Sequence, residues 1–290
     1  MFKQIAIIGV GLLGGSFGLA AKKAGISKRA LGVGRSEERL QKAVDAGAID
    51  RYTTSVEEAC AESDLVLLAS HLQHSISLFP VIAEHAAEGT LVTDVGSVKG
   101  AVVSAAEKAF DHTRFFVGSH PMAGSDKTGV GHARDDLFEG AVCYVTATPN
   151  TDTGALSRIV CMWKTLGAEV MVCRPERHDF LVSLSSHMPH FAAVGIADTL
   201  RHSDSDENLL RFIVGSGFCD TTRLAKGSPD MWTDICKLNG PCIVEAIDRF
   251  IESMETLKRR IAQNDFDGIR AILNDVKSFR ESLENDRHET

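Results

Sequence analysis

Three glycines near the start of the chain have the spacing of a loop that binds the phosphates of a dinucleotide. They follow the apolar segment 3–9, which we expect to form a buried parallel strand, and they precede a helix. Gly9 permits the tight turn, Gly11 lets the backbone approach a pyrophosphate, and Gly14 allows the helix to pack closely on the strand. The amides and dipole of the helix N-terminus favour phosphate charge. The alternative is a glycine-rich turn without a ligand. The segment that we expect to bind NAD or NADP is Gly9-Val10-Gly11-Leu12-Leu13-Gly14.

The end of the second expected strand, 29–33, bears on the choice between NAD and NADP. NAD sites usually carry an acidic residue there, which binds the ribose hydroxyls. This chain has Gly34, Arg35 and Ser36 at that position, and its first acidic residue is Glu37. Arg35 can bind a 2′-phosphate in a bidentate manner and Ser36 adds a hydroxyl, so the sequence favours NADP over NAD. Alternatively, Arg35 is a solvated surface residue, or it stacks on the adenine in a site that accepts either cofactor.

Two polar segments follow later strands. Residues 93–100 (Thr-Asp-Val-Gly-Ser-Val-Lys-Gly) come after a strand expected at 90–94. Residues 117–129, which include His120, come after a strand expected at 115–118. Ligands of open α/β sheets bind at the carboxyl ends of the strands. We therefore expect both segments at that edge, with His120 on a loop constrained by the proline and glycine that follow it.

The elements that would position these residues change in kind at about residue 174. Up to that point short apolar runs alternate with helical stretches, which predicts an α/β fold with a doubly wound sheet and right-handed crossovers. Beyond it the apolar spacing is helical. We predict a Rossmann-type dinucleotide-binding domain at residues 1–174 and an all-helical domain at residues 175–290, whose apolar faces would form a homodimer. The expected strands are 3–9, 29–33, 64–69, 90–94, 115–118, 141–146 and 168–173, and the expected helices are 14–25, 36–47, 179–202, 207–212 and 232–290.

Composition and charge narrow the class of protein. The 290 residues are 44% hydrophobic and 24% charged, as in a globular protein with a substantial core. The net charge of −8 disfavours a general nucleic-acid binder, which needs a basic face. No uninterrupted apolar run reaches the roughly 18 to 20 residues that span a bilayer. Segment 1–5 leads straight into a strand, without room for a signal peptide. We expect a cytoplasmic protein with neither a membrane nor a nucleic-acid partner.

The cysteines and the paired histidines do not have the pattern of a metal site. Seven cysteines are scattered without a CxxC pair, which favours reduced, buried thiols over disulfides or zinc ligands. His187 and His190 would share a helix face, but no third ligand has a suitable spacing. We therefore expect no metal.

Several separate motifs occur in one order along nearly the whole chain. They are Gly96-Ser97-Val98-Lys99-Gly100, the segment from Gly118-Ser119-His120-Pro121 to Gly129, Ser186-His187-Met188-Pro189-His190, the segment from Gly217-Phe218 to Arg223, and Asp230-Met231-Trp232-Thr233-Asp234-Ile235. In this order they resemble the prephenate, arogenate and cyclohexadienyl dehydrogenases of tyrosine biosynthesis. The resemblance implies an NAD(P)-dependent oxidative decarboxylation of prephenate or arogenate, to 4-hydroxyphenylpyruvate or tyrosine. Hydride leaves the ring carbon that bears the hydroxyl, that oxygen becomes a carbonyl, and the quaternary carboxylate departs as carbon dioxide while the ring becomes aromatic.

The resemblance also implies roles for single residues. His120 matches the group that binds the substrate hydroxyl and accepts its proton, a role that suits a neutral imidazole. Ser97 matches a hydroxyl that bonds this histidine and the reacting centre. Arg223 matches the arginine that binds a substrate carboxylate. A guanidinium suits this role because it binds carboxylates in a bidentate manner. The further substrate contacts would be His190, Ser119, Ser125 and Asp126, while Ser70 and His71 would border the nicotinamide ribose.

Each role has an alternative. His120 would otherwise be a structural histidine, Ser97 a helix N-cap, and Arg223 a member of a surface salt bridge. The chain also departs from its relatives at two places. Many have Thr-Pro-Val where residues 70–74 read Ser-His-Leu-Gln-His, and some have a lysine at the position of Cys219. The second difference leaves open how the second substrate carboxylate is held.

The substrate and the general function each have competing interpretations. Prephenate has a ketone where arogenate has an ammonium, and Asp126 would favour the ammonium unless it pairs with Lys127 or another cation. One alternative function is a β-hydroxyacid-type dehydrogenase, which typically uses a lysine of the helical domain as acid and base. The other is a non-catalytic NADP(H) sensor that binds the cofactor without turnover.

Overall fold

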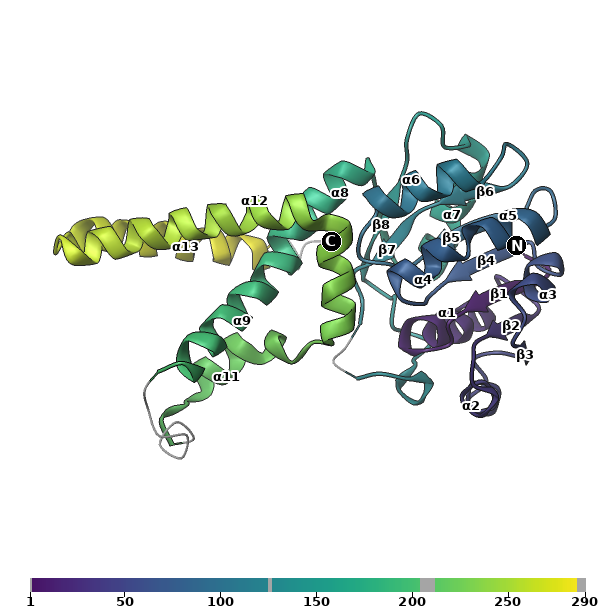
Figure 1. The fold of residues 1–290 in the computed structure, drawn as a ribbon, viewed down its shortest axis with the longest axis horizontal. Coiled ribbons are helices and arrows are strands. Elements are labelled where there is room, and N and C mark those ends of the chain that lie inside the picture. Colours follow the sequence, from purple (N-terminus) through teal and green to yellow (C-terminus); the bar gives the residue numbers. More distant parts are fainter. Residues whose placement is uncertain (1, 125–126, 204–211, 286–290) are drawn as a thin grey trace. The chain divides into compact units, whose positions relative to one another are not determined.

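The computed structural model describes residues 2–124, 127–203 and 212–285, with side chains as far as 283 (Figure 1). The chain forms two compact units, Met1–Cys242 and Ile243–Thr290. The first unit holds every described residue for which the sequence predicts a role in the site. The boundary predicted at residue 174 lies inside this first unit and stays a prediction.

A six-stranded parallel sheet forms the centre of the first unit, and it confirms the predicted doubly wound fold. The strand order is β3-β2-β1-β4-β5-β6, which reverses between β1 and β4 and so places a ligand crevice at their carboxyl ends. Edge strand β3 was missed because Arg51, Tyr52 and Thr53 are only half-buried or exposed and lack an apolar run. The strands are β1 (Ile5–Ile8), β2 (Ala30–Val33), β3 (Arg51–Thr53), β4 (Leu65–Leu68), β5 (Leu91–Asp94) and β6 (Phe115–Val117).

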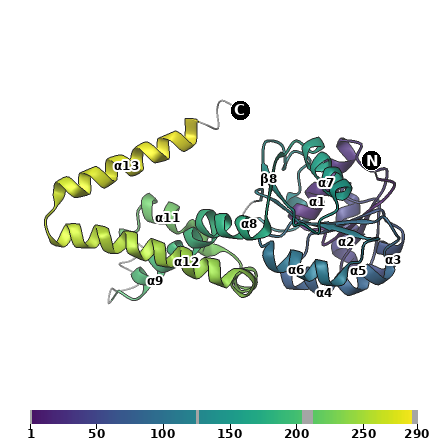
Figure 2. The same ribbon diagram turned by 90° about the horizontal axis from the view of Figure 1, so that it is seen from above.

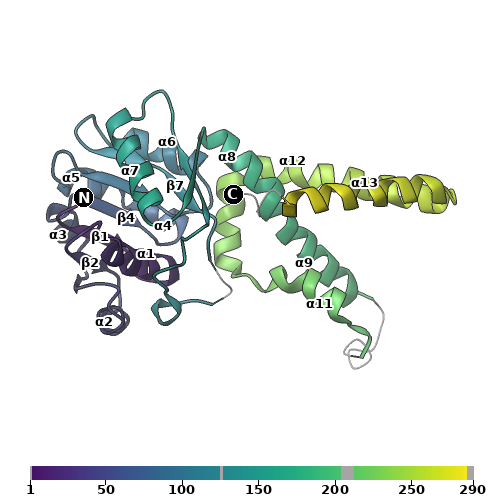
Figure 3. The same ribbon diagram turned by 180° about the vertical axis from the view of Figure 1, so that it is seen from behind.

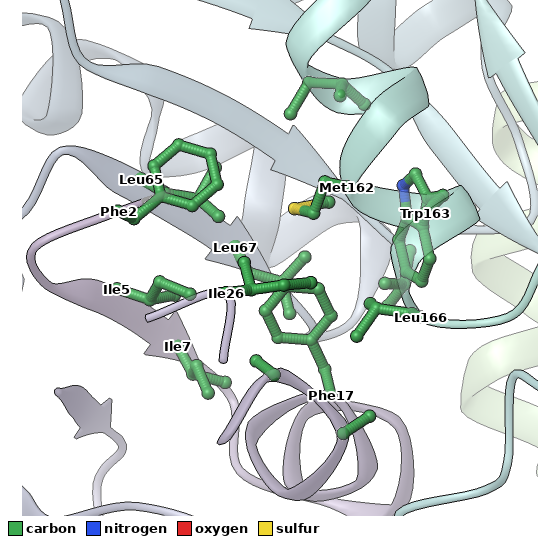
Figure 4. Close-up of a cluster of buried hydrophobic side chains, with 14 of the residues drawn as sticks. Phe2, Ile5, Ile7, Phe17, Ile26, Leu65, Leu67, Met162, Trp163 and Leu166 are labelled. Carbon is green, nitrogen blue, oxygen red and sulfur yellow. The ribbon is translucent and has the colours of Figure 1, made fainter. Parts of the chain in front are cut away.

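Helices cover both faces of this sheet (Figure 2). On one face Phe17 packs edge-on against Trp163 (Figure 4), with ring centroids 5.6 Å apart. Phe138 packs edge-on against the same tryptophan at 5.2 Å. On the other face Phe79 packs against Phe110 and Phe116 at 5.4 and 5.3 Å. The helices are α1 (Leu12–Lys23), α2 (Glu37–Asp45), α3 (Val56–Ala61), α4 (Leu72–Ser77), α5 (Phe79–His85), α6 (Gly100–Ala109) and α7 (Thr153–Thr165).

A second, three-stranded sheet contains the histidine of the predicted site. Strands β7 (Ser119–Pro121) and β9 (Glu169–Cys173) pair with β8 (Val142–Thr146), the first antiparallel and the second parallel. The strands predicted at 141–146 and 168–173 therefore exist, but they do not join the central sheet. His120 pairs with Tyr144, so the prediction that it lies on a loop was wrong. Its backbone hydrogen bonds to a neighbouring strand hold it in place.

The chain after residue 174 is helical, as predicted. Helix α8 (Pro175–Val182) continues through the π-helical turn η2 (Ser183–His187) into α9 (Met188–Arg201), and α11 packs against α9 (Figure 3). The helix predicted at 207–212 falls almost wholly outside the described residues. The remaining elements are η1 (Val130–His132), α11 (Ser216–Thr222), η3 (Arg223–Lys226), α12 (Pro229–Ala262), which bends at Asn239, and α13 (Phe266–Asn285).

One stretch, Pro175–Arg201, is long and apolar enough to cross a membrane by length and composition alone. The sequence analysis did not expect a membrane span here because two aspartates, three histidines and other polar residues interrupt the apolar ones. One of the aspartates, Asp179, and the three histidines, His178, His187 and His190, are buried inside the first unit. A single helix of this kind is weak support for a membrane span, because a core helix of a globular protein meets the same criteria.

Candidate active site

Two of the three loop glycines are required by packing within the chain. Gly9 has a φ of +98°, and a Cβ there would lie 2.6 Å from the carbonyl oxygen of Ala69. A Cβ on Gly14 would lie 2.1 Å from the Gly9 carbonyl oxygen. Both distances are far below van der Waals contact, so any larger residue would force β1, α1 and the end of β4 apart.

The third glycine, Gly11, faces open space. A Cβ built there meets no described atom within 4 Å. It is the N-cap of α1, and no side chain in the described chain caps that helix. The first turn also lacks an acidic residue, so its free amides and the positive end of the dipole are available to an anion. These residues fit the pyrophosphate of a dinucleotide, which needs close backbone approach more than side-chain contact.

The polar residues at the neighbouring strand ends lie where the sequence predicts them. Arg35 follows β2, is exposed and forms no ion pair with any described residue. Ser36 is the N-cap of α2, and its hydroxyl accepts a hydrogen bond from the Arg39 amide at 3.4 Å. Ser70 borders the glycine loop, since its amide nitrogen lies 3.0 Å from a Cβ built on Gly9. His71 is exposed at the N-terminus of α4.

The predicted proton acceptor belongs to a chain of three side chains. His120 Nδ1 lies 2.9 Å from Nε2 of His178, and Nδ1 of His178 lies 2.8 Å from Oδ1 of Asp179. His178 is fully buried, and His120 is only 9% exposed. The sequence analysis missed His178 and Asp179, which lie 58 and 59 positions after His120 and have no local motif.

A buried ion pair joins the strand of His120 to β5. The ammonium group of Lys99 bonds the carboxylate of Asp94 and donates to the Ser119 carbonyl at 2.9 Å. The other Asp94 oxygen accepts the Ser119 amide at 3.1 Å. Both charged side chains are almost completely buried, and breaking such a pair typically costs about 3–5 kcal/mol. The pair therefore ties the segment before His120 to the carboxyl end of β5.

The electrostatic surroundings keep His120 neutral. Burial, and after it the neighbouring His178, Lys99 and His187, lowers the pKa of His120 well below its usual value of 6.5. The imidazole is therefore unprotonated near pH 7. A neutral ring with one lone pair can accept a proton from a hydroxyl group.

The two predicted serines lie close to this centre in different settings. The Ser119 hydroxyl is fully buried and lies 2.8 Å from the hydroxyl of Thr93. This burial gives no support to a substrate contact. Ser97 is half-buried, and its hydroxyl makes no hydrogen bond to any described residue, His120 included. It is not a helix N-cap either, because Lys99 occupies the N-cap position of α6.

A second histidine group lies on η2 and α9. His190 stacks on Trp232 with ring centroids 3.5 Å apart. Helix α9, which carries His190, contacts η3, where Arg223 is exposed and forms no ion pair with the described residues. His187 is buried beside Asn239, at 3.3 Å from its side-chain nitrogen, and its Nε2 has no described partner. Burial lowers the pKa of His187 to about 4.

Some predicted positions cannot be placed in this site. Ser125 and Asp126 lie outside the described residues. Cys219, where some relatives have a lysine, is exposed on α11. Within the described ranges no three histidine, cysteine, aspartate or glutamate side chains gather closely enough to hold a metal ion.

Two family models match the chain almost end to end. The one described as the nucleotide-binding domain of prephenate dehydrogenase matches residues 17–172. The one described as the dimerization domain of prephenate dehydrogenase matches residues 174–275.

Whole-chain comparisons agree with these two models. The prephenate dehydrogenase of Bacillus subtilis is 33% identical over 284 residues, which are 98% of this chain and 76% of the relative. The cyclohexadienyl dehydrogenase of Zymomonas mobilis is 28% identical over 288 residues, 99% of this chain and 98% of that one. The crystal structure of Aquifex aeolicus prephenate dehydrogenase, solved with hydroxyphenyl propionate and NAD+, is 35% identical with a TM-score of 0.92, over 98% of this chain and 99% of that one. This chain belongs to the prephenate dehydrogenase family.

Proposed function

We propose that this protein catalyses the NAD(P)-dependent oxidative decarboxylation of prephenate or arogenate in tyrosine biosynthesis. The family membership supports the reaction class. The observation that carries the proposal is His120, a buried imidazole kept neutral near pH 7 beside the carboxyl edge of a dinucleotide-binding sheet. A dehydrogenase that oxidises an alcohol needs such a proton acceptor next to its cofactor.

Different residues of the chain have different roles in the proposed reaction. The bound nicotinamide cofactor supplies the acceptor for the hydride. His120 takes the hydroxyl proton, and Ser97 positions the hydroxyl oxygen. The guanidinium of Arg223, which forms no ion pair with the described residues, is available to bind a substrate carboxylate. Loss of carbon dioxide makes the ring aromatic, so the second step needs little from the protein beyond holding the ring in place.

A direct assay tests this function. Purified protein is mixed with prephenate or arogenate and with NAD or NADP, and the absorbance of the reduced cofactor is followed. Turnover in at least one of the four combinations is expected, and the ratio of kcat/KM values identifies the preferred substrate. Cofactor binding without turnover in any combination would contradict the proposal and favour the sensor function.

The preference between NADP and NAD is inferred from the residues that follow β2. Arg35 is exposed, unpaired with the described residues, and not accompanied by an acidic residue until Glu37. An acidic residue at that position would repel a 2′-phosphate, whereas a guanidinium binds it. We therefore expect a preference for NADP, although the capping role of Ser36 leaves its hydroxyl less available than the sequence suggested.

The second unit supports assembly as a homodimer. Its helices expose large apolar side chains, 46% to 64% accessible, which is unusual for a surface that stays in water. They are Val244, Ile251, Met254, Ile261, Phe266, Leu273, Val276, Phe279 and Leu283. Light scattering after size exclusion should give the mass of two chains, and Phe279→Glu should lower it while the exposed-site control Glu252→Gln should not. A wild-type mass of one chain at micromolar concentration would contradict the dimer.

A further inference from the structure

We infer that His178 and Asp179 are positioning residues that hold His120 in the tautomer with a free Nε2. The inference rests on the proposed function for its catalytic meaning. The tautomer itself is a property of the protein alone. Asp179 stands at one end of these hydrogen-bonded side chains, and its role in the bonds is unambiguous.

The carboxylate of Asp179 acts only as an acceptor. Its Oδ1 receives the amide of Lys99 at 2.7 Å, and its Oδ2 receives the amide of Gly100 at 2.8 Å. An ionised carboxylate has no proton to donate. The contact at 2.8 Å between Asp179 Oδ1 and His178 Nδ1 therefore requires that His178 carries its proton on Nδ1.

This proton sets the direction of the next bond. Burial lowers the pKa of His178, so the ring is neutral and has a single N–H. With that N–H on Nδ1, the Nε2 atom has a lone pair and acts as an acceptor. His120 Nδ1, at 2.9 Å from it, must then be the donor. The reverse arrangement would place two lone pairs against each other inside the protein.

The remaining nitrogen of His120, Nε2, then carries the lone pair. It is the only position on that neutral ring that can take a proton from the substrate hydroxyl. When it does so, the imidazolium donates through His178 toward the negative charge of Asp179. A base oriented by a second group, which is oriented in turn by a carboxylate, is the general arrangement of activated acid–base sites. The amides that begin α6 hold the carboxylate, so the GSVKG segment contributes to the same function.

Two substitutions of His178 test whether it orients His120 through a hydrogen bond or only fills space. His178→Gln offers an amide oxygen that can accept from His120 Nδ1, whereas His178→Leu fills similar space without an acceptor. We expect the leucine variant to lower kcat about 10²-fold or more, with the cofactor Kd and the substrate KM little changed, and the glutamine variant to recover a large part of kcat. Equal kcat in both variants, whether high or low, would overturn the inference.

An NMR measurement on the wild-type protein, which needs no turnover, tests the tautomer even if the His178 variants fail to fold. In wild-type protein labelled with ¹⁵N-histidine, the ring nitrogens of His120 are assigned by their absence in His120→Asn. The inference predicts a protonated Nδ1 and an unprotonated Nε2 near pH 7, and a protonated Nε2 would overturn it. If the wild-type protein turns over neither substrate, the proposed function fails, yet this spectrum still decides the tautomer.

Discussion

Two regions of the site are built from different parts of the chain: the cofactor edge at the glycine loop, residues 9–14, and the hydrogen-bonded side chains of His120, His178 and Asp179. At the glycine loop the chain contributes backbone: open space at Gly11, uncapped amides at α1, and tight contacts at Gly9 and Gly14. Around His120 it contributes side chains, because His178 and Asp179 come from α8 and meet a strand that pairs with β8. The first region is contiguous in sequence and the second is assembled from distant segments. Substitutions should therefore affect binding in the first region and the chemical step in the second.

The two regions also differ in their exposure to water. The α1 N-terminus faces open space, so an anion can approach its amides directly. His120, His178 and Asp179 are buried, with each polar contact directed at a specific partner. Buried polar networks are sensitive to the loss of a single member, since the remaining partners lose their hydrogen bonds without access to water. This difference gives the following predictions.

The largest effect is expected for His120→Ala. Loss of a general base typically lowers kcat about 10²- to 10⁴-fold, while the cofactor site, which is built from backbone, stays intact. Steady-state kinetics and a cofactor titration by fluorescence measure the two quantities on one sample. The exposed His112→Ala is the matched control and should leave both unchanged. A comparable loss in cofactor affinity for His120→Ala would contradict the division between the two regions.

Arg35→Ala tests a charged side chain that we expect to bind the cofactor. Charge-assisted hydrogen bonds contribute about 1.5–3 kcal/mol, so NADP affinity should fall roughly 10- to 100-fold, with a much smaller change for NAD. Isothermal titration with both cofactors measures this. Arg29→Ala, at the amino end of β2, is the control and should affect neither. Equal losses for NAD and NADP would exclude a 2′-phosphate contact.

Gly11→Ala tests the backbone character of the loop. The new methyl group meets no described atom within 4 Å, so the melting temperature should change little. It would project into the space that the pyrophosphate needs, and we expect cofactor Kd to rise about tenfold, or ~1.4 kcal/mol. Gly195→Ala, also in open space but on α9, is the control. Unchanged cofactor affinity in the Gly11 variant would show that the phosphates bind elsewhere.

At His187 we expect an effect on the pH dependence of stability. Its pKa is lowered from 6.5 to about 4 by burial, so between these values the unfolded chain binds the proton first. The contribution of the neutral His187 ring to the free energy of unfolding is fully present above pH 6.5. It falls as the pH decreases toward 4, by at most ~1.4 kcal/mol per pH unit. Denaturant unfolding at several pH values measures the slope. His187→Leu should have a shallower slope than the wild type, and an identical slope would contradict the assignment.

The glycine loop shows what local sequence can predict. The strand, the three glycines and the helix are adjacent, and each glycine is explained by a contact or a space within a few residues or on the neighbouring strand. The N-cap that Ser36 forms on α2 is a similarly local feature, since its hydroxyl bonds an amide three residues later. His120 was also predicted from its motif, but its strand depends on pairing with β8, more than 20 residues later.

His178 and Asp179 could not be predicted in the same way. Their partners are chosen by tertiary packing, and a histidine followed by an aspartate has no motif of its own. A signal did exist: Asp179, Ser183, His187 and His190 interrupt an apolar helix at nearly helical spacing. Polar residues on the buried side of a helix need partners, which points to a site, but not to which atoms of the first half of the chain they contact.

The pH dependence of kcat/KM tests the central claim, that a buried and neutral His120 accepts the substrate proton. The acid limb of this profile reports the pKa of the essential base in the free enzyme. Since burial lowers the pKa of His120 well below 6.5, activity should stay constant from pH 8 to below pH 6.5 and decline only in more acidic solution. An acid limb at or above pH 6.5, or one that persists unchanged in His120→Ala, would contradict the account.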